Sequence, residues 1–300
     1  MLLDVNFDAD GLLVAEADGR IVGAAYGVRR LTARVGSDLE TGTGWLVFFF
    51  VAPQARGAGL GWRLVRGVLD WLATQGVTTV HYSGYTPNYF LPGLDETRYR
   101  QAAGLLRSQG FVVDEYAHAM DQDLTDYEIP DRVRSRVAEL ESGGWRFGSP
   151  HGDDVVELVD VAGRFSWDWA QGLRESAIAR PESVVMARSP QGGLIGWAAV
   201  ATWDGDVEHF GPFGVLPSSR GTGLGECLLH LTLERVRALG GHNAWFLWVE
   251  QDTPAYSLYR KAGFRDTRTL SILHADLPSA VPPPKPEHPE EFAPKKGNPS

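Results

Sequence analysis

The sequence predicts a mixed α/β fold in which two similar α+β domains follow one another along the chain. The main observation is a glycine-rich stretch that occurs twice, as Arg56–Gly61 and as Arg220–Gly225. Each copy follows an apolar, strand-like run and precedes a run whose apolar residues recur at three and four positions, the pattern of an amphipathic helix. The 300 residues are also enough for two hydrophobic cores of about 130 residues each.

The charge of the chain limits its partners. The formal net charge at pH 7 is -10 and the pI is about 5.3. Binding to nucleic acid or to an anionic membrane depends on clustered Lys and Arg, so we expect neither as a main partner. An acidic protein is better suited to a cationic or amine-bearing substrate.

The single cysteine, Cys227, allows no internal disulfide and no zinc spacing, which indicates a reducing compartment and no bound metal. We interpret Cys227 as a small buried residue on the helix after the second glycine-rich copy. The longest apolar run, around Trp45–Ala52, is too short to cross a bilayer, and no segment resembles a cleavable signal. The sequence therefore predicts a cytoplasmic protein.

Residues 1–126 are predicted to form the first domain. Two strand-like runs, Leu12–Ala17 and Arg20–Val28, flank a hairpin turn, and further strands are expected at Trp45–Val51, Val77–Ser83 and Phe111–Leu124. The arginines after the hairpin are interpreted as part of a solvated loop. They are Arg29, Arg30 and Arg34.

The aromatic segment at residues 84–93 is an insertion relative to the second copy. It either covers a ligand or packs on the other domain, and packing is the favoured interpretation.

Residues 127–144 form the predicted linker, because Asp131–Glu141 has helical composition, follows a proline and ends at two glycines. Residues 145–277 form the second domain, with a strand from Trp145, a helix from Asp153, a hairpin, the second glycine-rich copy and two further strands around a short helix. Residues 278–300 are rich in Pro, Glu and Lys and are predicted to be a disordered tail.

The glycine-rich turns are candidate anion sites. A strand, a turn and a helix start gather unpaired N–H groups and the positive end of the helix dipole, which favours a phosphate or pyrophosphate. The dinucleotide-binding fingerprint is excluded, because it needs a third glycine where the first copy has Trp62 or Leu64. A Walker loop is excluded too, since no Gly-Lys-Ser/Thr follows.

Both turns resemble motif A of the GNAT acetyltransferase superfamily, R/Q-x-x-G-x-G/A. Each copy is preceded by Val-x-Pro-x-x-Arg, from Val51 and from Val215, and is followed by a Gly-Phe pair at Gly110 and at Gly263. The chain is identified as a tandem GNAT protein, similar in its two-repeat arrangement to mycothiol synthase. The resemblance implies an acyl-CoA N-acyltransferase fold in each repeat, acetyl-CoA as the acetyl donor, and a first repeat without the strand and helices that open the GNAT fold.

The same resemblance assigns the residues that hold the coenzyme, which lie at the end of each strand and along each turn. In the second repeat they are Phe213, Gly214, Val215, Arg220, Gly221, Thr222, Gly223, Leu224, Gly225 and Glu226. In the first repeat they are Phe49, Phe50, Val51, Arg56, Gly57, Ala58, Gly59, Leu60, Gly61 and Trp62. Asp252, or Thr253 with a shift of one residue, stands where the family has an asparagine that contacts the cofactor.

Candidate catalytic residues occur in the second repeat. The family's acid, which protonates the leaving thiolate, is a tyrosine four residues before the Gly-Phe pair; Tyr259 holds this position, whereas the first repeat has Leu106. The base corresponds to the strand before motif A, where Glu208 and His209 would face opposite sides. We favour His209, because an imidazole exchanges a proton near neutral pH. The first repeat has Trp45 there, so we interpret it as a degenerate half.

The sequence predicts an N-acetyltransferase that moves an acetyl group directly from acetyl-CoA to a primary amine of a small molecule in a ternary complex. Two alternatives stay open, a non-catalytic acyl-CoA-binding or regulatory protein and an acyltransferase for a protein or carrier-protein partner. The protein is expected to be a monomer or a homodimer. Four tryptophans either line an acceptor pocket or, as we favour, pack in the core: Trp167, Trp169, Trp197 and Trp203.

Overall fold

The computed structural model describes residues 2–33, 39–86, 88 and 90–278. The helices and strands of its first repeat are β1 (Leu12–Ala17), β2 (Arg20–Arg29), β3 (Thr43–Val51), α1 (Leu60–Thr74), β4 (Thr79–Tyr82), α2 (Arg100–Ser108) and β5 (Val112–Asp123). The helix α3 (Asp131–Ser142) follows. The elements of the second repeat are β6 (Arg146–Gly148), α4 (Asp154–Gly163), α5 (Trp167–Ala179), β7 (Val184–Arg188), β8 (Leu194–Val200), β9 (Phe210–Val215), α6 (Leu224–Ala238), β10 (Asn243–Phe246), α7 (Pro254–Ala262) and β11 (Arg265–Asp276).

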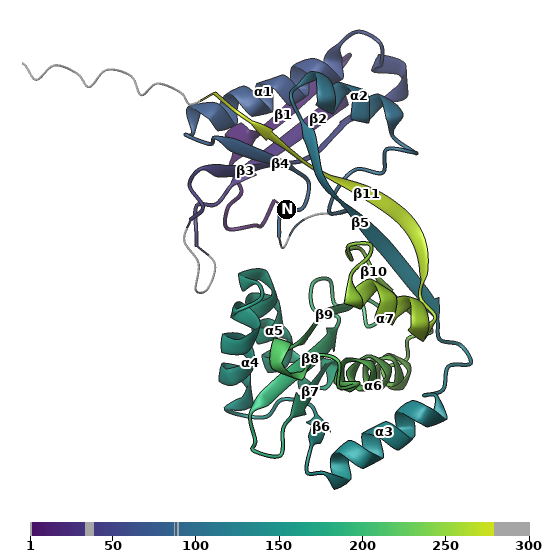
Figure 1. The fold of residues 1–300 in the computed structure, drawn as a ribbon. Helices are drawn as coiled ribbons and strands as arrows, with labels where there is room; N and C mark the ends of the chain where they lie inside the picture. The colour runs from purple at the N-terminus through teal and green to yellow at the C-terminus, as the bar shows by residue number, and fades with distance from the viewer. Residues whose placement is uncertain (1, 34–38, 87, 89, 279–300) are drawn as a thin grey trace, which may run out of the picture.

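The expected mixed α/β fold is confirmed. In the described part of the chain the strands form a seven-stranded sheet, in the order β1-β2-β3-β4-β11-β5-β10, and a four-stranded sheet, in the order β6-β7-β8-β9. The two sheets belong to two α/β bodies, which the long strands β5 and β11 join (Figure 1). Most of the predicted strands lie where the sequence places them, because alternating and apolar runs are local signals.

The strand, turn and helix around each glycine-rich copy fold alike. Gly57 and Gly59 have φ of 90° and 72°, and Gly221 and Gly223 have φ of 76° and 85°. All four lie in the left-handed region, which residues with a Cβ rarely adopt. The glycines therefore allow the same turn twice, and the helices that follow it begin at equivalent positions, in α1 and in α6.

The parallel strands before the turns separate from each other at different points. In the first repeat, β3 and β4 pair from Thr43 and Thr79 as far as Leu46 and Tyr82. In the second repeat, the corresponding described segments meet at one bridge, between His209, just before β9, and Trp245 of β10. The second repeat therefore opens more widely, and the sheet is divided at this point.

The last strands of the two repeats are exchanged. β11 pairs with β4 of the first repeat, for example His274 with His81, and also with β5 along most of its length. β5 in turn pairs with β10 of the second repeat, for example Met120 with Phe246. Each repeat thus completes the other repeat's sheet.

Helices α2 and α5 have no counterpart in the sequence-based prediction. Helix α5 contains the tryptophan-rich stretch, and its buried face consists of small residues and Leu173, which gives a weak helical pattern. The helix expected in the linker is present as α3, and it packs against α6. Cys227 is buried, as expected, on the first turns of α6.

The arginines after the hairpin were expected to be solvated, and for Arg30 this is wrong. Its side chain is 3% exposed, because Nε donates to Glu40 Oε2 at 2.8 Å and the guanidinium stacks on Trp45 and Tyr85. Arg29 donates to Gln75. Arg34 and most of the predicted tail lie outside the described residues. Among the described residues, no helix is both long and apolar enough to cross a membrane.

Candidate active site

In both repeats a hydrogen bond connects the glycine-rich turn to the end of the preceding strand. Arg220 donates from Nε to the carbonyl of Val215 at 3.2 Å, and Arg56 donates from Nε to the carbonyl of Val51 at 3.0 Å. The two arginines that open the motifs therefore hold the chain between strand and turn in one shape. The resemblance to motif A implies that these two arginines hold the coenzyme. The structure shows that they also bond to the end of their own strand.

The third glycine of each copy, Gly225 or Gly61, lets the start of the helix pack closely on neighbouring side chains. A Cβ at Gly225 would lie 3.5 Å from the ring of Phe213, and a Cβ at Gly61 would lie 3.0 Å from Leu105. In contrast, a Cβ at Gly57, Gly59 or Gly221 would meet no atom within 4 Å. These three glycines thus face open space, whereas Gly223 has the side chain of Arg136 nearby. The structure brings the predicted coenzyme residues of each repeat together along one strand end and one helix start.

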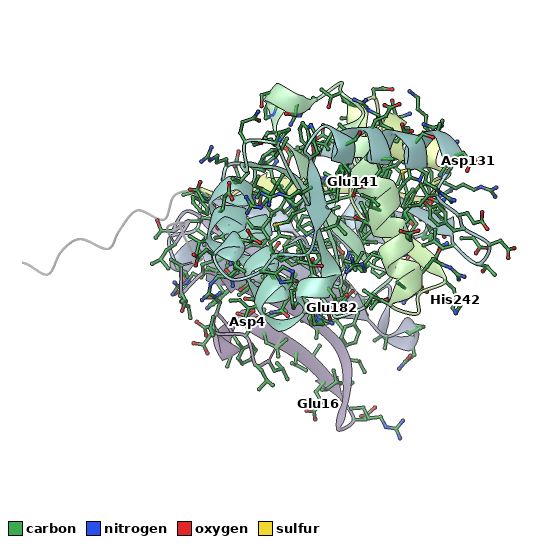
Figure 2. The ribbon with its side chains drawn as sticks, turned by 90° about the horizontal axis from the view of Figure 1, so that it is seen from below. Asp4, Glu16, Asp131, Glu141, Glu182 and His242 are labelled. Atoms are coloured by element: carbon green, nitrogen blue, oxygen red, sulfur yellow. The ribbon has the colours of Figure 1, made fainter. Side chains whose placement is uncertain are left out.

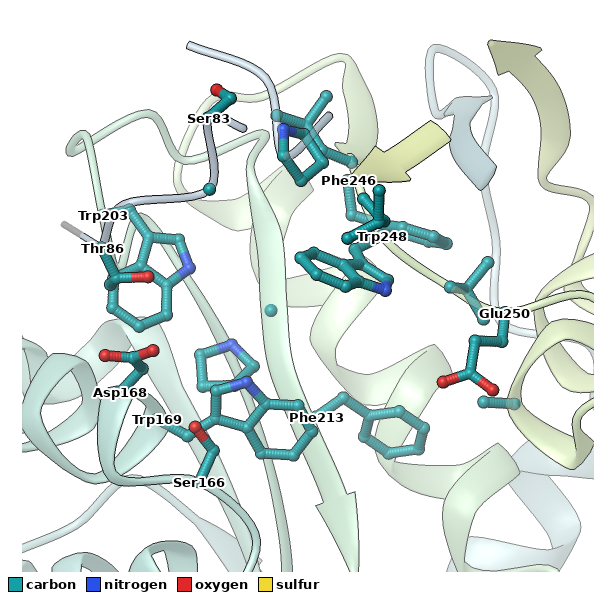
Figure 3. Close-up of a pocket in the computed structure, with 18 of the residues that line it drawn as sticks. Ser83, Thr86, Ser166, Asp168, Trp169, Trp203, Phe213, Phe246, Trp248 and Glu250 are labelled. Carbon is teal, nitrogen blue, oxygen red and sulfur yellow. The ribbon is translucent and has the colours of Figure 1, made fainter. Parts of the chain in front are cut away.

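A pocket of about 920 Å³ lies between the two repeats. Arg220 of the second turn lines one part of it, and Tyr259 and His209 line its interior. Its other wall comes from the first repeat, through residues of β3 and β4 and of the segment after β4. Figure 3 shows Ser83 and Thr86 of that segment opposite Asp168 and Trp169 of α5. The pocket therefore connects the second turn with a space that both repeats enclose.

Tyr259 lies on α7 and is 7% exposed. Its ring packs on Phe246, with ring centroids 4.6 Å apart, and on Phe210, at 5.9 Å. Burial raises the pKa of Tyr259 well above its ordinary value, because the phenolate would lose its hydration. The phenol consequently keeps its proton at neutral pH and can donate it into the pocket.

In the first repeat, Leu106 occupies the equivalent helix α2 and is fully buried in the core with Leu69 and Leu72. A side chain of this size contributes about 2 kcal/mol through its burial. The position that presents a hydroxyl in the second repeat therefore serves packing in the first.

The two base candidates are placed differently. Strand β9 begins at Phe210, contrary to the expected strand from Glu208: Glu208 lies in a turn, and His209 forms the isolated bridge to Trp245. The carboxylates of Asp204 and Asp206 accept from the backbone N–H groups of Asp206 and Glu208 in this turn. Oε1 of Glu208 accepts from the backbone N–H groups of His242 and Asn243, at 2.7 and 3.1 Å. Glu208 thereby caps the start of β10 and does not line the pocket.

His209 does line the pocket. It is 8% exposed, its ring stacks on Trp245 with centroids 4.0 Å apart, and Nδ1 lies 2.8 Å from Asp204 Oδ2. Because an ionised carboxylate can only accept, this contact assigns the proton of the neutral ring to Nδ1 and leaves the lone pair on Nε2. Stacking and hydrogen bonding fix the ring in one orientation.

The loop after β10 carries the residues that replace the family's asparagine. Asp252 is exposed, with φ of 62°, and is outside the pocket lining. Thr253 lines the pocket and caps α7, since its Oγ1 accepts from the N–H of Tyr256 and donates to the carbonyl of Glu250.

A carboxylate pair stands beside this loop and was not predicted. Glu250 lines the pocket, and the bridge between Ala117 and Glu250 brings it beside Glu115 of β5. Burial and the neighbouring Glu250 raise the pKa of Glu115. A strand of the first repeat therefore contributes an acidic group beside the site of the second.

The four tryptophans have three different environments. Trp169 and Trp203 line the pocket, Trp197 of β8 is fully buried, and Trp167 is 41% exposed beside Gly163. Trp45 and Trp248 line the pocket as well, although the sequence gave no reason to group them there. The insertion at 84–93 lines the pocket through Thr86 and Pro92. Its last residue, Gly93, lies against the backbone of Ser271 in β11. Pro87 and Tyr89 lie outside the described residues.

Comparison with known protein families decides the class. The model of the acetyltransferase (GNAT) family matches the chain in two parts, residues 2–89 and 152–264. The chain belongs to the GNAT acetyltransferase family. The two matches include the two glycine-rich copies, at Arg56–Gly61 and at Arg220–Gly225.

Curated relatives of this GNAT protein carry one name. This chain is 29% identical over 160 residues to the mycothiol acetyltransferase of Arthrobacter sp. strain FB24, and the match covers 49% of this chain and 46% of that protein. It is 25% identical over 232 residues to the mycothiol acetyltransferase of Pseudarthrobacter chlorophenolicus, covering 71% of this chain and 65% of that protein. The chain thus matches less than two thirds of the length of these relatives.

Solved structures agree with the tandem arrangement. A GCN5-related N-acetyltransferase from Sphaerobacter thermophilus superposes with a TM-score of 0.64 at 18% identity, covering 89% of this chain and 81% of that chain. A tandem GNAT protein from the clavulanic acid biosynthesis pathway gives a TM-score of 0.61 at 17% identity, covering 90% and 85%. At this identity the likeness establishes the fold of the tandem GNAT protein.

Proposed function

We propose that the protein transfers an acetyl group from acetyl-CoA to a primary amine of a small molecule, that the second repeat performs the chemistry, and that the amine binds in the pocket between the repeats. The observation that carries the proposal is that Arg220 of the second turn, Tyr259 and His209 all line one pocket. This supports a site in which the donor, the acid and the base share one cavity, as direct transfer in a ternary complex requires.

Acetyl-CoA supplies a thioester whose carbonyl carbon the amine attacks. His209 accepts a proton from the substrate ammonium at Nε2, with Asp204 holding Nδ1–H and so stabilising the charged ring. Tyr259 gives its proton to the departing thiolate. The strand end at Phe213 and Gly214, in β9, would lie along the donor and offer one backbone N–H to the carbonyl oxygen. Each residue has one task, and the second repeat supplies them all.

The acceptor is an amine with ring-like, polar character. Four pocket-lining tryptophans offer flat apolar faces, and Glu250 contributes a carboxylate to the lining beside Thr253. The name of the curated relatives makes mycothiol-related amines, together with amino sugars, the first acceptors to test.

The proposal is tested by thiol release from acetyl-CoA in the presence of a library of primary amines, with the acetylated product identified by mass spectrometry. We expect release that depends on the amine and on Tyr259. Binding of acetyl-CoA without thiol release for every amine would favour a binding or regulatory protein, and acetylation of added proteins alone would favour a macromolecular acceptor.

A further inference from the structure

The two glycine-rich turns share one backbone shape, yet their surroundings differ. Helix α3 lies along the outer side of the second repeat, with Asp131 and Glu141 near its ends (Figure 2), and it packs against α6. The corresponding turn of the first repeat has a different neighbour, the end of α2, where Gln109 donates to the carbonyl of Trp62 at 3.4 Å. The linker therefore distinguishes the two turns.

Arg136 of α3 reaches the second turn. Its Nη2 donates to the carbonyl of Thr222 at 3.2 Å, and its Nε would lie 3.8 Å from a Cβ at Gly223, where no other atom lies within 4 Å. The side chain is 43% exposed, and Nη1 donates to Glu139 of its own helix at 3.0 Å. An exposed pair of this kind contributes little, so it is easily exchanged for a stronger anionic partner.

Arg132, one turn earlier on α3, serves a second residue of the same site. Its Nη1 donates to Oε1 of Glu226 at 2.6 Å. Glu226 lies in the first turn of α6, where its negative charge would repel a phosphate bound at the helix start. The ion pair compensates this charge. At the equivalent position the first repeat has the neutral Trp62.

We propose that Arg136 of the linker helix is a ligand of the acetyl donor's pyrophosphate at the second turn, and that Arg132 neutralises Glu226 so that this turn accepts an anion. Guanidinium and phosphate form charge-assisted hydrogen bonds in fixed geometry. The inference rests on the proposed function, in that it takes the donor to be coenzyme A. It assigns a binding role to a helix outside both GNAT repeats and explains why the second turn differs from the first.

The test measures hydrogen–deuterium exchange of the full chain during a titration with CoA. Protection of the peptide at 221–228 reports the second turn, and protection of the peptide at 57–64 reports the first. For Arg136→Gln we expect the CoA concentration at half-protection of 221–228 to rise about tenfold, with an unchanged melting temperature and no effect at 57–64. Arg164→Gln is the control, because Arg164 forms an exposed pair with Asp160 on α4.

The outcomes separate the two proposals. Equal half-protection in the wild type and Arg136→Gln would overturn the assignment of Arg136. No protection of 221–228 in the wild type at any CoA concentration would overturn donor binding itself, on which the proposed function depends. A repeat of the titration with 3′-dephospho-CoA should give the same tenfold loss; if the loss disappears, Arg136 meets the 3′-phosphate and the pyrophosphate assignment is wrong.

The role of Arg132 is tested by a double-variant comparison. Arg132→Gln should weaken CoA protection at 221–228, since Glu226 is left with its charge, and Arg132→Gln with Glu226→Gln should restore it to near the wild-type value. If the double variant stays as weak as Arg132→Gln, charge compensation is not the function of this pair.

Discussion

His209 stacks face to face on Trp245 across the opening between β9 and β10, with ring centroids 4.0 Å apart and planes inclined by 15°. The first repeat has the same pairing with the residue types exchanged, because Trp45 of β3 pairs with His81 of β4. Those rings are 6.4 Å apart. Burial lowers the pKa of His81, so a neutral ring faces the pocket from that side. The equivalent position before the glycine-rich turn thus holds the imidazole of His209 in the second repeat and the indole of Trp45 in the first.

We expect His209→Gln to remove the acidic limb from the pH profile of kcat/KM, since Gln cannot accept the substrate's proton. Glu208→Ala should keep the profile and lower the free energy of unfolding by about 1–2 kcal/mol, because it removes the oxygen that accepts from two backbone N–H groups. Steady-state kinetics on one amine and urea unfolding measure the two effects. An unchanged profile in His209→Gln would assign the base elsewhere, first to Glu250.

Tyr259→Phe removes one hydroxyl and keeps the ring. If that hydroxyl protonates the thiolate, kcat should fall about 10²–10⁴-fold while KM for acetyl-CoA changes little. Tyr256→Phe is the matched control on the same helix, because the hydroxyl of Tyr256 bonds to Asp266. A loss of less than about threefold in Tyr259→Phe would make Tyr259 a packing residue, given the size that general acid catalysis has.

Gly223→Glu places a side chain and a negative charge at a left-handed position of the second turn. We expect it to abolish turnover and the binding of acetyl-CoA at that turn. Gly59→Glu makes the same change in the first repeat and should reduce turnover far less. Calorimetry counts the sites, up to two for each wild-type chain. Equal losses of turnover would contradict the assignment of the chemistry to the second repeat.

Arg30→Met should destabilise the wall that the first repeat contributes to the pocket. The change removes the partner of Glu40 and the cation that stacks on Trp45 and Tyr85, and we expect a loss of about 2 kcal/mol in the free energy of unfolding. Arg66→Met, which breaks an exposed pair with Asp70, should cost less than about 0.5 kcal/mol. Denaturant titrations compare them, and equal costs would contradict the buried role.

His230 should make the fold sensitive to acid. Burial lowers the pKa of His230 below the value of about 6.5 in the unfolded chain, and its Nδ1 lies 2.6 Å from the hydroxyl of Tyr127. In the window between those two pKa values the unfolded chain binds more protons, so the free energy of unfolding decreases as the pH falls. We expect His230→Gln to reduce this decrease, and His242→Gln, at an exposed site, to leave it. Urea unfolding between pH 5 and 7.5 tests this, and equal slopes in the wild type and His230→Gln would contradict it.

The features that the sequence predicted well depend on near neighbours in the chain. The strand, turn and helix at Arg56 and at Arg220 follow from glycine spacing and apolar periodicity, which act over a few residues. The exchange of β5 and β11 could not be predicted, because both strands have the same apolar pattern and either partner satisfies it. The position of Trp45 and Glu250 in one pocket with Tyr259 follows from that exchange.

The environment of a residue type that occurs both in loops and in cores could not be predicted from the sequence either. Arg30 is typical of a solvated loop in composition, and only the fold brings Glu40 and Tyr85 around it. Trp197 and Trp203 are the same residue type on neighbouring segments, yet one is fully buried and the other lines the pocket. The side that each ring faces depends on sheet register and on packing between distant segments.

The exchanged strands also affect the order in which the protein can be completed during synthesis. β4 ends at Tyr82, but the strand that pairs with it, β11, leaves the ribosome after nearly two hundred further residues have been translated. Until then the first half presents an unpaired sheet edge, which can associate with other chains. Termination of translation within the second repeat would therefore release a first half in which β11 does not cover the edge of β4. Both halves are therefore completed by the same late segment, which pairs with β4 and with β5.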